Sequence, residues 1–430
     1  MKTQERKHFP RDGATDSGHP DYHLCQVFPL YDETGFPSTC ARVDGRLTVG
    51  REAGLDNRLE IFDYAASRDH FRLEVVDRKL LLTDLNSTNG TFVNGELTRT
   101  RLVSLQDVIR IADSIFVITD EPPVGDREAE QRGVTVCSGA SARAVAHVRK
   151  VAREKRCVLF LGETGTGKDV MVKLLHDFSG RSGKLVTVNC ATIQEALLET
   201  TLFGCVEGAF TGSKESAGLV AEAHLGTLFL DEIGELPDHL QAKLLRFLET
   251  GEVLAVGATS PARFTVRVAA ATNRLNVQAR AGAALRQDLL GRLEDEVVRL
   301  TPLRLRREEI VPLMCRAIRA RRVSPGKALD PYAVECALLY DWPRNVRQLL
   351  KSTESALVHG ERRETLSHQV FDDLLAAPQA EEQRDAARPG ATPTSGELRA
   401  ALRAAEGNIT EVAKHFGCHR KQVYRWLKRF

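Results

Sequence analysis

Several features of membrane and secreted proteins are missing from this 430-residue sequence. No apolar run is long enough to cross a bilayer. Residues 1–22 are polar and lack the apolar stretch of a signal peptide, so we expect a disordered tail there. The nine cysteines form neither a CxxC pair nor a Cys/His cluster, which argues against zinc and favours buried free thiols. We therefore expect a cytoplasmic protein without a membrane partner.

The sequence also lacks a large net charge. Its formal net charge is +2, so any contact with nucleic acid requires a local basic patch. Such a patch lies at the end of the chain, where five of the last twelve residues are basic and none is acidic. These five are Arg420, Lys421, Arg425, Lys428 and Arg429.

The length predicts about three domains, and the residue patterns suggest where they lie. Residues 23–120 contain short strand-like runs with Asn-Gly pairs suited to tight hairpins, the pattern of an all-β domain. The runs are at 46–49, 71–76, 80–82 and 109–118, and the Asn-Gly pairs are at 89–90 and 94–95. Residues 121–133, rich in Pro, Gly and acidic residues, are interpreted as a linker.

From residue 134 the pattern changes to strands that alternate with helices, typical of a parallel α/β sheet. The predicted strands are 158–161, 186–188, 228–230 and 266–270, with a helix over 168–178 and helices after Trp342. Residues 377–396 read as a second linker and 397–430 as a small all-α unit. The predicted fold is therefore multidomain: all-β, then α/β with a helical lid, then all-α.

A glycine-rich loop stands between the first α/β strand and its helix, the context of a phosphate-binding loop. Glycines let backbone N–H groups wrap phosphates, and the lysine that opens the helix reaches the β and γ phosphates. A plain Gly-rich turn between strand and helix is the structural alternative. The loop residues are Gly162, Glu163, Thr164, Gly165, Thr166, Gly167 and Lys168, followed by Asp169 where the general pattern has Ser or Thr.

A second motif supports nucleotide chemistry. The strand at 228–230 ends in Asp231 and Glu232. Asp231 would hold the metal, directly or through water, and Glu232 would orient and deprotonate the attacking water. Solvated acids at a strand end are the alternative, and the presence of a phosphate-binding loop as well favours the catalytic interpretation. Together the two motifs predict an ATPase that uses ATP and Mg²⁺.

Five further segments resemble the AAA+ domain of sigma-54-dependent transcriptional activators, the bacterial enhancer-binding proteins. The resemblance covers residues 134–376 and explains Asp169, because the family carries an acid after the loop lysine. The segments are 202–213 with its GAFTG sequence, 226–236 (GTLFLDEIGEL), 270–274 (AATNR), 302–306 (PLRLR) and 342–349 (WPRNVRQL).

The resemblance implies roles for particular residues. Asn189 matches the polar switch that restrains the catalytic glutamate, and Asn273 matches the sensor at the end of its strand. Arg286 and Arg292 match arginine fingers that enter a neighbouring subunit's site, which implies a homo-oligomeric ring, expected to be a hexamer. Arg347 matches the second sensor, on the lid. The loop that contacts sigma-54 would include Gly208, Phe210, Thr211 and Gly212.

Several positions depart from the family pattern around the loop. Ser213 replaces the final Ala of the signature, Thr201 replaces Glu, residues 205–207 replace His-Glu-Lys, and Arg344 replaces Gly. The residues for hydrolysis are intact. The departures therefore bear on coupling to sigma-54 and leave a second hypothesis open: a DNA-bound phosphoprotein adaptor or repressor that binds ATP without engaging sigma-54.

Three fragments of the β-rich front resemble a forkhead-associated (FHA) domain: Gly50-Arg51, residues 67–70 and residues 87–91. The resemblance implies a phosphothreonine-bearing partner linked to a Ser/Thr kinase, in a role like two-component signalling. His70 is expected to brace the loop rather than touch the ligand. A sandwich that kept the fold and lost the ligand is the alternative. The phosphothreonine-binding residues would be Arg51, Ser67, Arg68, Thr88 and Asn89.

The last segment resembles the Fis-type helix-turn-helix of the same activator family. Its second helix would enter the major groove of double-stranded DNA upstream of a promoter. A basic amphipathic helix with a solvated face is the alternative. The DNA-binding residues would be Arg420, Lys421, Gln422, Tyr424, Arg425 and Lys428. The whole chain is then expected to remodel sigma-54 RNA polymerase at the expense of ATP.

Overall fold

The computed structural model describes residues 21–37, 39–52, 57–209, 214–273, 285–359 and Ala401. The chain divides into two units, Met1–Asp372 and Asp373–Phe430. The predicted tail up to residue 20, the second linker and nearly all of the helix-turn-helix lie outside the described residues. Within the described part, no helix is long and apolar enough to cross a membrane.

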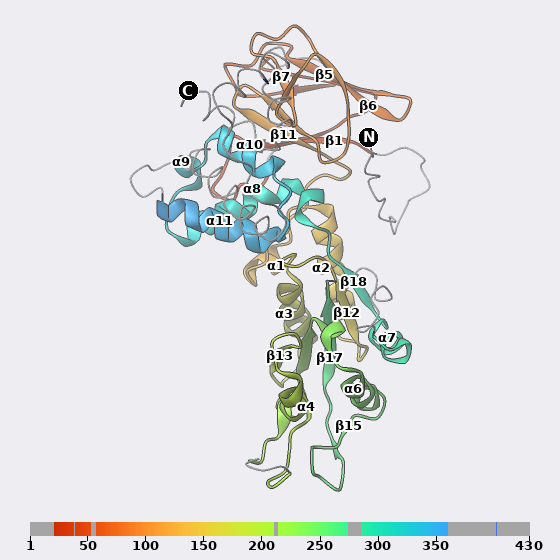
Figure 1. Cartoon of the computed structure of the whole chain (residues 1–430). Coiled ribbons are helices and arrows are strands. Elements are labelled where there is room, and N and C mark those ends of the chain that lie inside the picture. Colours follow the sequence, from red (N-terminus) through yellow and green to blue (C-terminus); the bar gives the residue numbers. More distant parts are fainter. Residues whose placement is uncertain are drawn as a thin grey trace. The chain divides into compact units, whose positions relative to one another are not determined.

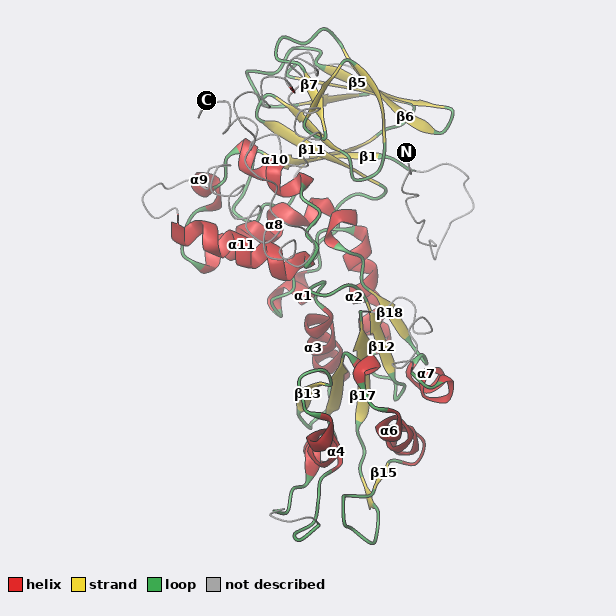
Figure 2. Cartoon of the chain, in the orientation of Figure 1, coloured by secondary structure: helices red, strands yellow, loops and turns green. Residues whose placement is uncertain are grey.

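The front of the chain is a sandwich of two β-sheets, as predicted (Figures 1 and 2). Alternate residues along the strands face the interior, where Leu24, Phe71 and Phe116 are fully buried. One sheet has the order β2-β1-β11-β10-β7-β8 and the other β4-β3-β5-β6-β9. The bounds are β1 (His23–Phe28), β2 (Thr39–Arg42), β3 (Arg46–Gly50), β4 (Arg58–Glu60), β5 (Phe71–Val76), β6 (Lys79–Asp84), β7 (Thr91–Val93), β8 (Glu96–Thr98), β9 (Thr100–Val103), β10 (Val108–Ile111) and β11 (Ser114–Thr119).

Two local predictions in the sandwich are wrong. The run 109–118 is not one strand, because a turn at Ala112, with φ 47°, divides it into β10 and β11. The pair Asn89-Gly90 does not close a hairpin, because it joins β6 of one sheet to β7 of the other. Asn94-Gly95 does close the β7–β8 hairpin, with φ 52° and 78°.

The prediction of free thiols is wrong for one pair of cysteines. Cys25 and Cys40 form a disulfide between β1 and β2. They stand at opposed positions in the strand register, with Cα atoms 4.1 Å apart. Sequence spacing alone does not reveal this register. The free cysteines of the described chain are Cys137, Cys157, Cys190, Cys205, Cys315 and Cys336.

The α/β part is built on a parallel sheet of order β13-β14-β17-β12-β18. Its strands are apolar on both faces, as parallel strands covered by helices require. Along β12, Leu159 and Leu161 pack into one core and Val158 and Phe160 into the other. The bounds are β12 (Val158–Leu161), β13 (Leu185–Asn189), β14 (Thr227–Asp231), β17 (Arg267–Thr272) and β18 (Val297–Arg299).

Helices cover the two faces of this sheet. Helices α2 and α3 contribute to one core, and α4, α6 and α7 to the other. A small hairpin, β15–β16, follows α6 (Figure 1). The bounds are α2 (Gly139–Val151), α3 (Lys168–Ser179), α4 (Glu195–Phe203), α5 (Gly218–Glu222), η1 (Ile233–Glu235), α6 (Asp238–Thr250), β15 (Glu252–Val253), β16 (Ala262–Arg263) and α7 (Gln287–Leu293).

A helical lid follows the sheet. Trp342 is fully buried, and its indole N–H donates to the Ala337 carbonyl at 2.7 Å. The segment predicted as the first linker contains a short helix, α1 (Arg127–Gln131), whose Ala129 is buried in the α/β core. The lid elements are η2 (Leu303–Leu305), η3 (Arg307–Glu309), α8 (Ile310–Ala320), α9 (Pro325–Ala328), α10 (Pro331–Leu339) and α11 (Asn345–His359).

Candidate functional site

The loop after β12 has the geometry of a phosphate-binding loop. Gly167 caps α3 with φ 102°, a conformation that favours glycine, so Lys168 begins the helix. The Lys168 ammonium donates to the backbone oxygens of Gly162 (2.9 Å) and Glu163 (3.3 Å). Burial lowers the pKa of Lys168, and the two acids at the end of β14 raise it. The lysine is therefore held at the carboxyl edge of the sheet, close to both acids.

The lid contacts the phosphate-binding loop at Glu163, the second residue of the loop. Arg304 donates two parallel hydrogen bonds to the Glu163 carboxylate, both 2.7 Å long, and Asn345 donates a third at 3.2 Å. The Arg304 guanidinium lowers the pKa of Glu163. The Arg347 backbone N–H donates to the Gly165 carbonyl at 3.3 Å. Loop and lid are thus joined by a bidentate ion pair.

The two predicted acids lie together at the end of β14. Burial raises the pKa of Glu232, the nearby Lys168 lowers it, and Asp231 raises it again. Asn189, predicted to restrain Glu232, donates its amide N–H to Asp231 at 3.2 Å in this structure. Strand register explains this contact, because Asn189 pairs with Asp231 across β13 and β14. Glu232 accepts a hydrogen bond from the backbone of Asn273.

Four other predicted site residues lie around the phosphate-binding loop: Thr164, Thr166, Asp169 and Asn273. Asn273 follows β17, and its amide lies 3.5 Å from the Thr164 hydroxyl. The Thr166 hydroxyl donates to the Glu163 carbonyl at 2.8 Å, which stabilises the loop internally. Asp169 is exposed on the first turn of α3.

Asp231, at the end of β14, is the carboxylate that could hold a metal ion beside the phosphate-binding loop. Within the described ranges, no group of three or more His, Cys, Asp or Glu side chains forms a metal cage. Mg²⁺ at nucleotide sites is commonly held by one or two carboxylates together with phosphate oxygens and water. Asp231 at the strand end fits that requirement, because it is partly exposed and stands near Lys168.

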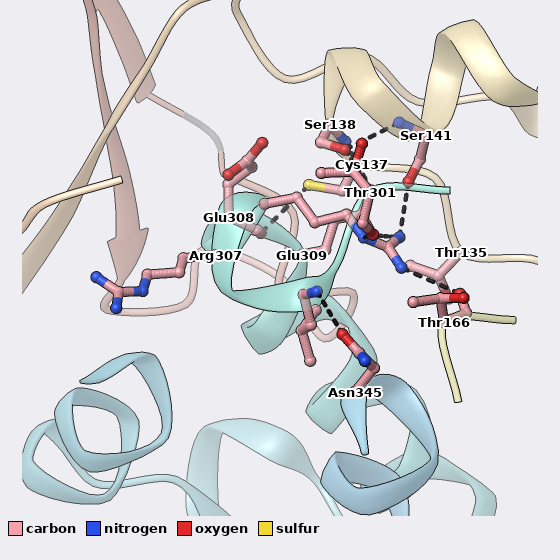
Figure 3. A network of polar contacts seen from close by, with 12 residues as sticks. Thr135, Cys137, Ser138, Ser141, Thr166, Thr301, Arg307, Glu308, Glu309 and Asn345 are labelled. Atoms are coloured by element: carbon pink, nitrogen blue, oxygen red, sulfur yellow. Dashed lines mark hydrogen bonds and ion pairs between the residues drawn. The ribbon is translucent and has the colours of Figure 1, made fainter. Parts of the chain in front are cut away.

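A network around a buried ion pair of the lid reaches α2 and the phosphate-binding loop (Figure 3). Arg306 and Glu309 form this pair, and they are 7% and 0% exposed. Arg306 also donates to the Ser141 hydroxyl (2.8 Å) and to the Thr166 carbonyl (3.2 Å). Glu309 accepts from the Ser138 hydroxyl at 2.6 Å. Removing one partner of such a pair costs about 3–5 kcal/mol, so this network fixes lid, α2 and loop together.

The two predicted arginine fingers lie on the surface around α7. Arg286 pairs with Asp288 at 2.7 Å, and Arg292 lies 3.9 Å from Glu249. Their side chains are 47% and 56% exposed. Both guanidinium groups therefore face solvent, where another subunit has access to them.

The predicted sigma-54 loop leaves the domain between α4 and α5 through a rigid base. Cys205 exchanges two backbone hydrogen bonds with Ser216, each 2.9 Å, and its thiol donates to the Lys214 carbonyl. Val206 bonds to Val256 on the neighbouring loop at 3.0 Å. Cys205, which replaces a family histidine, is therefore part of the loop's base. Gly208 is described, with φ 77°, whereas Phe210, Thr211, Gly212 and Ser213 lie outside the described residues.

Three loops of the sandwich converge as predicted for phosphothreonine binding. The Arg51 N–H donates to the Ser67 carbonyl at 3.1 Å, and the Ser67 hydroxyl accepts from the Thr88 N–H at 3.0 Å. A Cβ on Gly50 would stand 1.9 Å from the Arg68 carbonyl, so only glycine permits this approach. The side chains of Arg51, Arg68 and Thr88 are exposed at this end of the sandwich.

His70 braces these loops, as predicted. It is fully buried, its Nδ1 accepts from the Ser67 N–H (3.1 Å), and its Nε2 lies 3.2 Å from the Gly90 carbonyl. Burial lowers the pKa of His70, which favours the neutral ring. Asn89, predicted to meet a bound peptide, donates its amide to the Ala65 carbonyl at 2.7 Å and so joins two of the loops.

Sequence reasoning missed two exposed aromatic residues beside this site. Phe62 and Tyr64 are 78% and 96% exposed. Asp63 between them is anchored, because it accepts hydrogen bonds from Asp113 and Ser114 at 3.1 and 3.0 Å. No signal in the sequence identified them, because an aromatic residue in a β-rich segment is more often part of the core. Arg304, Arg306 and Asn345 lie within the family motifs 302–306 and 342–349, but the motifs alone predicted no role for these three residues.

A parallel α/β sheet with a phosphate-binding loop, a strand that ends in Asp231-Glu232 and a helical lid define a P-loop ATPase of the AAA+ class. Comparisons with known proteins agree. Residues 134–299 match the sigma-54 interaction domain, 47–112 the FHA domain and 397–430 a homeodomain-like domain. The predicted DNA-binding residues fall in that last match, outside the described residues.

Relatives span most of the chain. The transcriptional regulatory protein ZraR of Klebsiella oxytoca is 35% identical, over 72% of this chain and 71% of its own. The nitric oxide reductase transcription regulator NorR1 of Cupriavidus necator is 33% identical, over 98% and 81%. A crystal structure of NtrX from Brucella abortus in complex with ATP is 27% identical, covers 68% of each chain and has a TM-score of 0.50. The chain belongs to the family of sigma-54-dependent transcriptional activators and carries an FHA domain.

Proposed function

We propose that the chain hydrolyses ATP and uses the energy to remodel sigma-54 RNA polymerase bound at a promoter. One observation carries the proposal: Lys168, Asp231 and Glu232 meet at the carboxyl edge of the sheet, in the domain that also projects the sigma-54 loop. The family membership supports the same conclusion. The C-terminal segment, where Arg420, Lys421, Gln422, Tyr424, Arg425 and Lys428 would contact DNA, holds the protein upstream of the promoter.

The residues divide the work of hydrolysis. The backbone of the loop and Lys168 bind the phosphates of ATP, the substrate. Mg²⁺, held by Asp231, would neutralise phosphate charge. Glu232 orients the attacking water and accepts its proton. Burial raises the pKa of Glu232, and the base works only when it is deprotonated. As the pH is lowered, turnover should therefore begin to fall at a higher pH than it would with an exposed glutamate. Arg304 holds Glu163 and so lets the lid respond to nucleotide.

Arginines from a neighbouring subunit complete each site in this proposal. We expect Arg286→Ala or Arg292→Ala to abolish ATPase activity, because transition-state charge then loses its arginine finger. Mixing either variant with Lys168→Ala should restore part of the activity, since some shared sites then combine two intact halves. ATPase assays on mixed and separate variants check this. If the rings assemble and no mixture shows rescue, the arginines do not act in trans.

The FHA domain supplies control in this proposal. Its three loops would read a phosphothreonine on a protein linked to a Ser/Thr kinase, with Arg51 on the phosphate. The geometry of Arg51, Ser67 and Thr88 supports this role, because it brings the loops to one exposed end of the sandwich. Phe62 and Tyr64, on either side of the anchored Asp63, would offer an exposed aromatic surface to flanking peptide residues.

Replacing Arg51 tests the peptide site. One charge-assisted hydrogen bond contributes about 1.5–3 kcal/mol, so Arg51→Ala should weaken phosphothreonine-peptide binding by about tenfold to a hundredfold. Calorimetric titration of matched threonine and phosphothreonine peptides measures the effect. Arg42→Ala is the matched control, because Arg42 pairs with Asp21 at 2.8 Å on a different strand. Equal affinity of the wild type for both peptides would make the domain a structural module only.

A further inference from the structure

One surface of the sandwich contacts the lid within the unit Met1–Asp372. Arg110 of β10 donates to Glu335 of α10 at 2.8 Å, and both side chains are 11% exposed. The Arg110 guanidinium also stacks on the rings of Phe92 (4.1 Å) and Tyr332 (5.3 Å). A buried ion pair between two aromatic rings is a specific contact, since either charge alone would be costly to bury.

Gln106, in the loop between β9 and β10, makes a second contact. Its amide N–H donates to the Glu308 carboxylate at 3.0 Å, and its amide oxygen accepts from the Arg307 N–H at 2.5 Å. The Arg307 guanidinium donates to the Gln106 carbonyl at 2.7 Å. Glu308 is so buried here that the pKa of its carboxyl rises to about 7. Three hydrogen bonds therefore join one glutamine to η3.

The contacted element is a direct neighbour of the nucleotide loop. Arg307 and Glu308 of η3 lie between Arg306 and Glu309, the buried pair that bonds to Thr166 and to α2. In Figure 3 Glu308 and Arg307 point away from Glu309. A short element held on both sides cannot shift at one side alone. Movement of the sandwich at Gln106 is therefore transmitted to the phosphate-binding loop.

The linker that follows the sandwich is bound to the α/β part. Glu121, just after β11, forms an ion pair with Arg143 of α2, and Asp126 pairs with Arg149 of α2 at 2.9 Å. The sandwich thus contacts the lid through Gln106, Arg110 and also Glu33, which accepts from the Ser324 hydroxyl at 3.1 Å. The linker after β11 joins it to α2. Because AAA+ turnover requires lid movement, such a bridge restrains the enzyme.

The phosphothreonine loops stay free in this arrangement. Strand β9 runs from Thr100, opposite Thr83, to Val103, opposite Leu80. It therefore leads away from the loop after Asp84, which holds Thr88, and toward Gln106. The Gln106 contact therefore lies at the opposite end of the sandwich from the phosphothreonine loops, whereas Arg110 contacts the lid from the face of the sheet, at the position opposite Phe92. The side chains of Arg51, Arg68 and Thr88 stay exposed.

We propose that the surface of the sandwich formed by Gln106 and Arg110 is a docking surface for the lid of the same chain, and that docking restrains ATP turnover. The restraint rests on the ATPase proposed above, whereas the docking itself does not. A phosphoprotein can then bind the free loops without first displacing the lid.

Variants of the full chain test both parts. Arg110→Ala and the milder Gln106→Ala should raise basal ATPase turnover by about fivefold or more, within the usual range of coupling between sites. Hydrogen exchange of residues 303–309 and 331–339 should accelerate by about tenfold. Arg101→Ala is the control, because Arg101 pairs with Glu96 at 2.9 Å on the same sandwich. Combining Arg110→Glu with Glu335→Arg should restore the wild-type values, which a folding defect would not.

The outcomes separate the two parts. Wild-type exchange in both Arg110→Ala and Gln106→Ala overturns the docking. Faster exchange with unchanged or lower ATPase turnover overturns the restraint. If the wild-type chain itself has no ATPase activity, the proposed function fails and the restraint with it, while the exchange data still decide the docking.

Discussion

Glu232→Gln should bind ATP with near wild-type affinity and hydrolyse it about 100-fold more slowly or worse, the usual contribution of a general base. The amide keeps the shape of the carboxylate and cannot accept a proton from water. Glu232 is suited to the role because burial and Asp231 raise its pKa, which makes the carboxylate a stronger base. The nearby Lys168 lowers the same pKa and so favours the ionised carboxylate. Nucleotide binding by fluorescence and phosphate release by a coupled assay measure the two effects separately.

Two controls define what this result means. Lys168→Ala should weaken binding and turnover together, because the lysine contacts the phosphates themselves. Glu222→Gln alters a similar side chain outside the predicted chemistry, one that pairs with Lys184 at 3.3 Å, and should leave turnover unchanged. If Glu232→Gln turns over ATP at the wild-type rate, Glu232 is not the base.

Thr211→Ala should leave ATP hydrolysis intact and abolish its coupling to sigma-54. The substitution lies at the predicted tip of the sigma-54 loop, beyond the rigid base formed by Cys205 and Ser216. We therefore expect ATPase activity close to wild type, with loss of sigma-54 binding and of open-complex formation. Gel-shift assays with sigma-54 and transcription from a sigma-54 promoter measure that loss.

Ser213→Ala is the matched control for the same loop. It restores the family residue, so coupling should be unchanged or improved. Equal transcription with the wild type and Thr211→Ala would instead favour the second hypothesis from the sequence, a DNA-bound adaptor or repressor that does not engage sigma-54.

Local features were predictable from the sequence because neighbouring residues determine them. The strand at 158–161 and the start of α3 at Lys168 were confirmed, since an apolar run, a glycine turn and a helix follow one another directly. His70 was correctly interpreted as a brace. The turn at Ala112 was missed because neither Ala nor Asp interrupts a strand-like run as strongly as glycine does.

Contacts between distant segments were not predictable. Arg304 and Glu163, which form a bidentate pair, are 141 residues apart in the sequence, and Gln106 and Glu308 are 202 apart. A charge in a motif does not reveal its partner. The contact of Asn189 with Asp231 was not predictable for a related reason, because the family pattern identifies the residue, while strand register decides which acid lies opposite it. The predicted role of Asn189 in restraining Glu232 stays a prediction.

Promoter melting tests the central claim most directly. Purified protein, sigma-54 RNA polymerase and a promoter with the protein's upstream DNA site are probed with permanganate, which reacts with unpaired thymines. We predict melting with the wild type and ATP, and none with ADP, a non-hydrolysable ATP analogue, or the Glu232→Gln variant. A wild-type protein that hydrolyses ATP and binds this DNA but leaves the promoter closed would contradict the account.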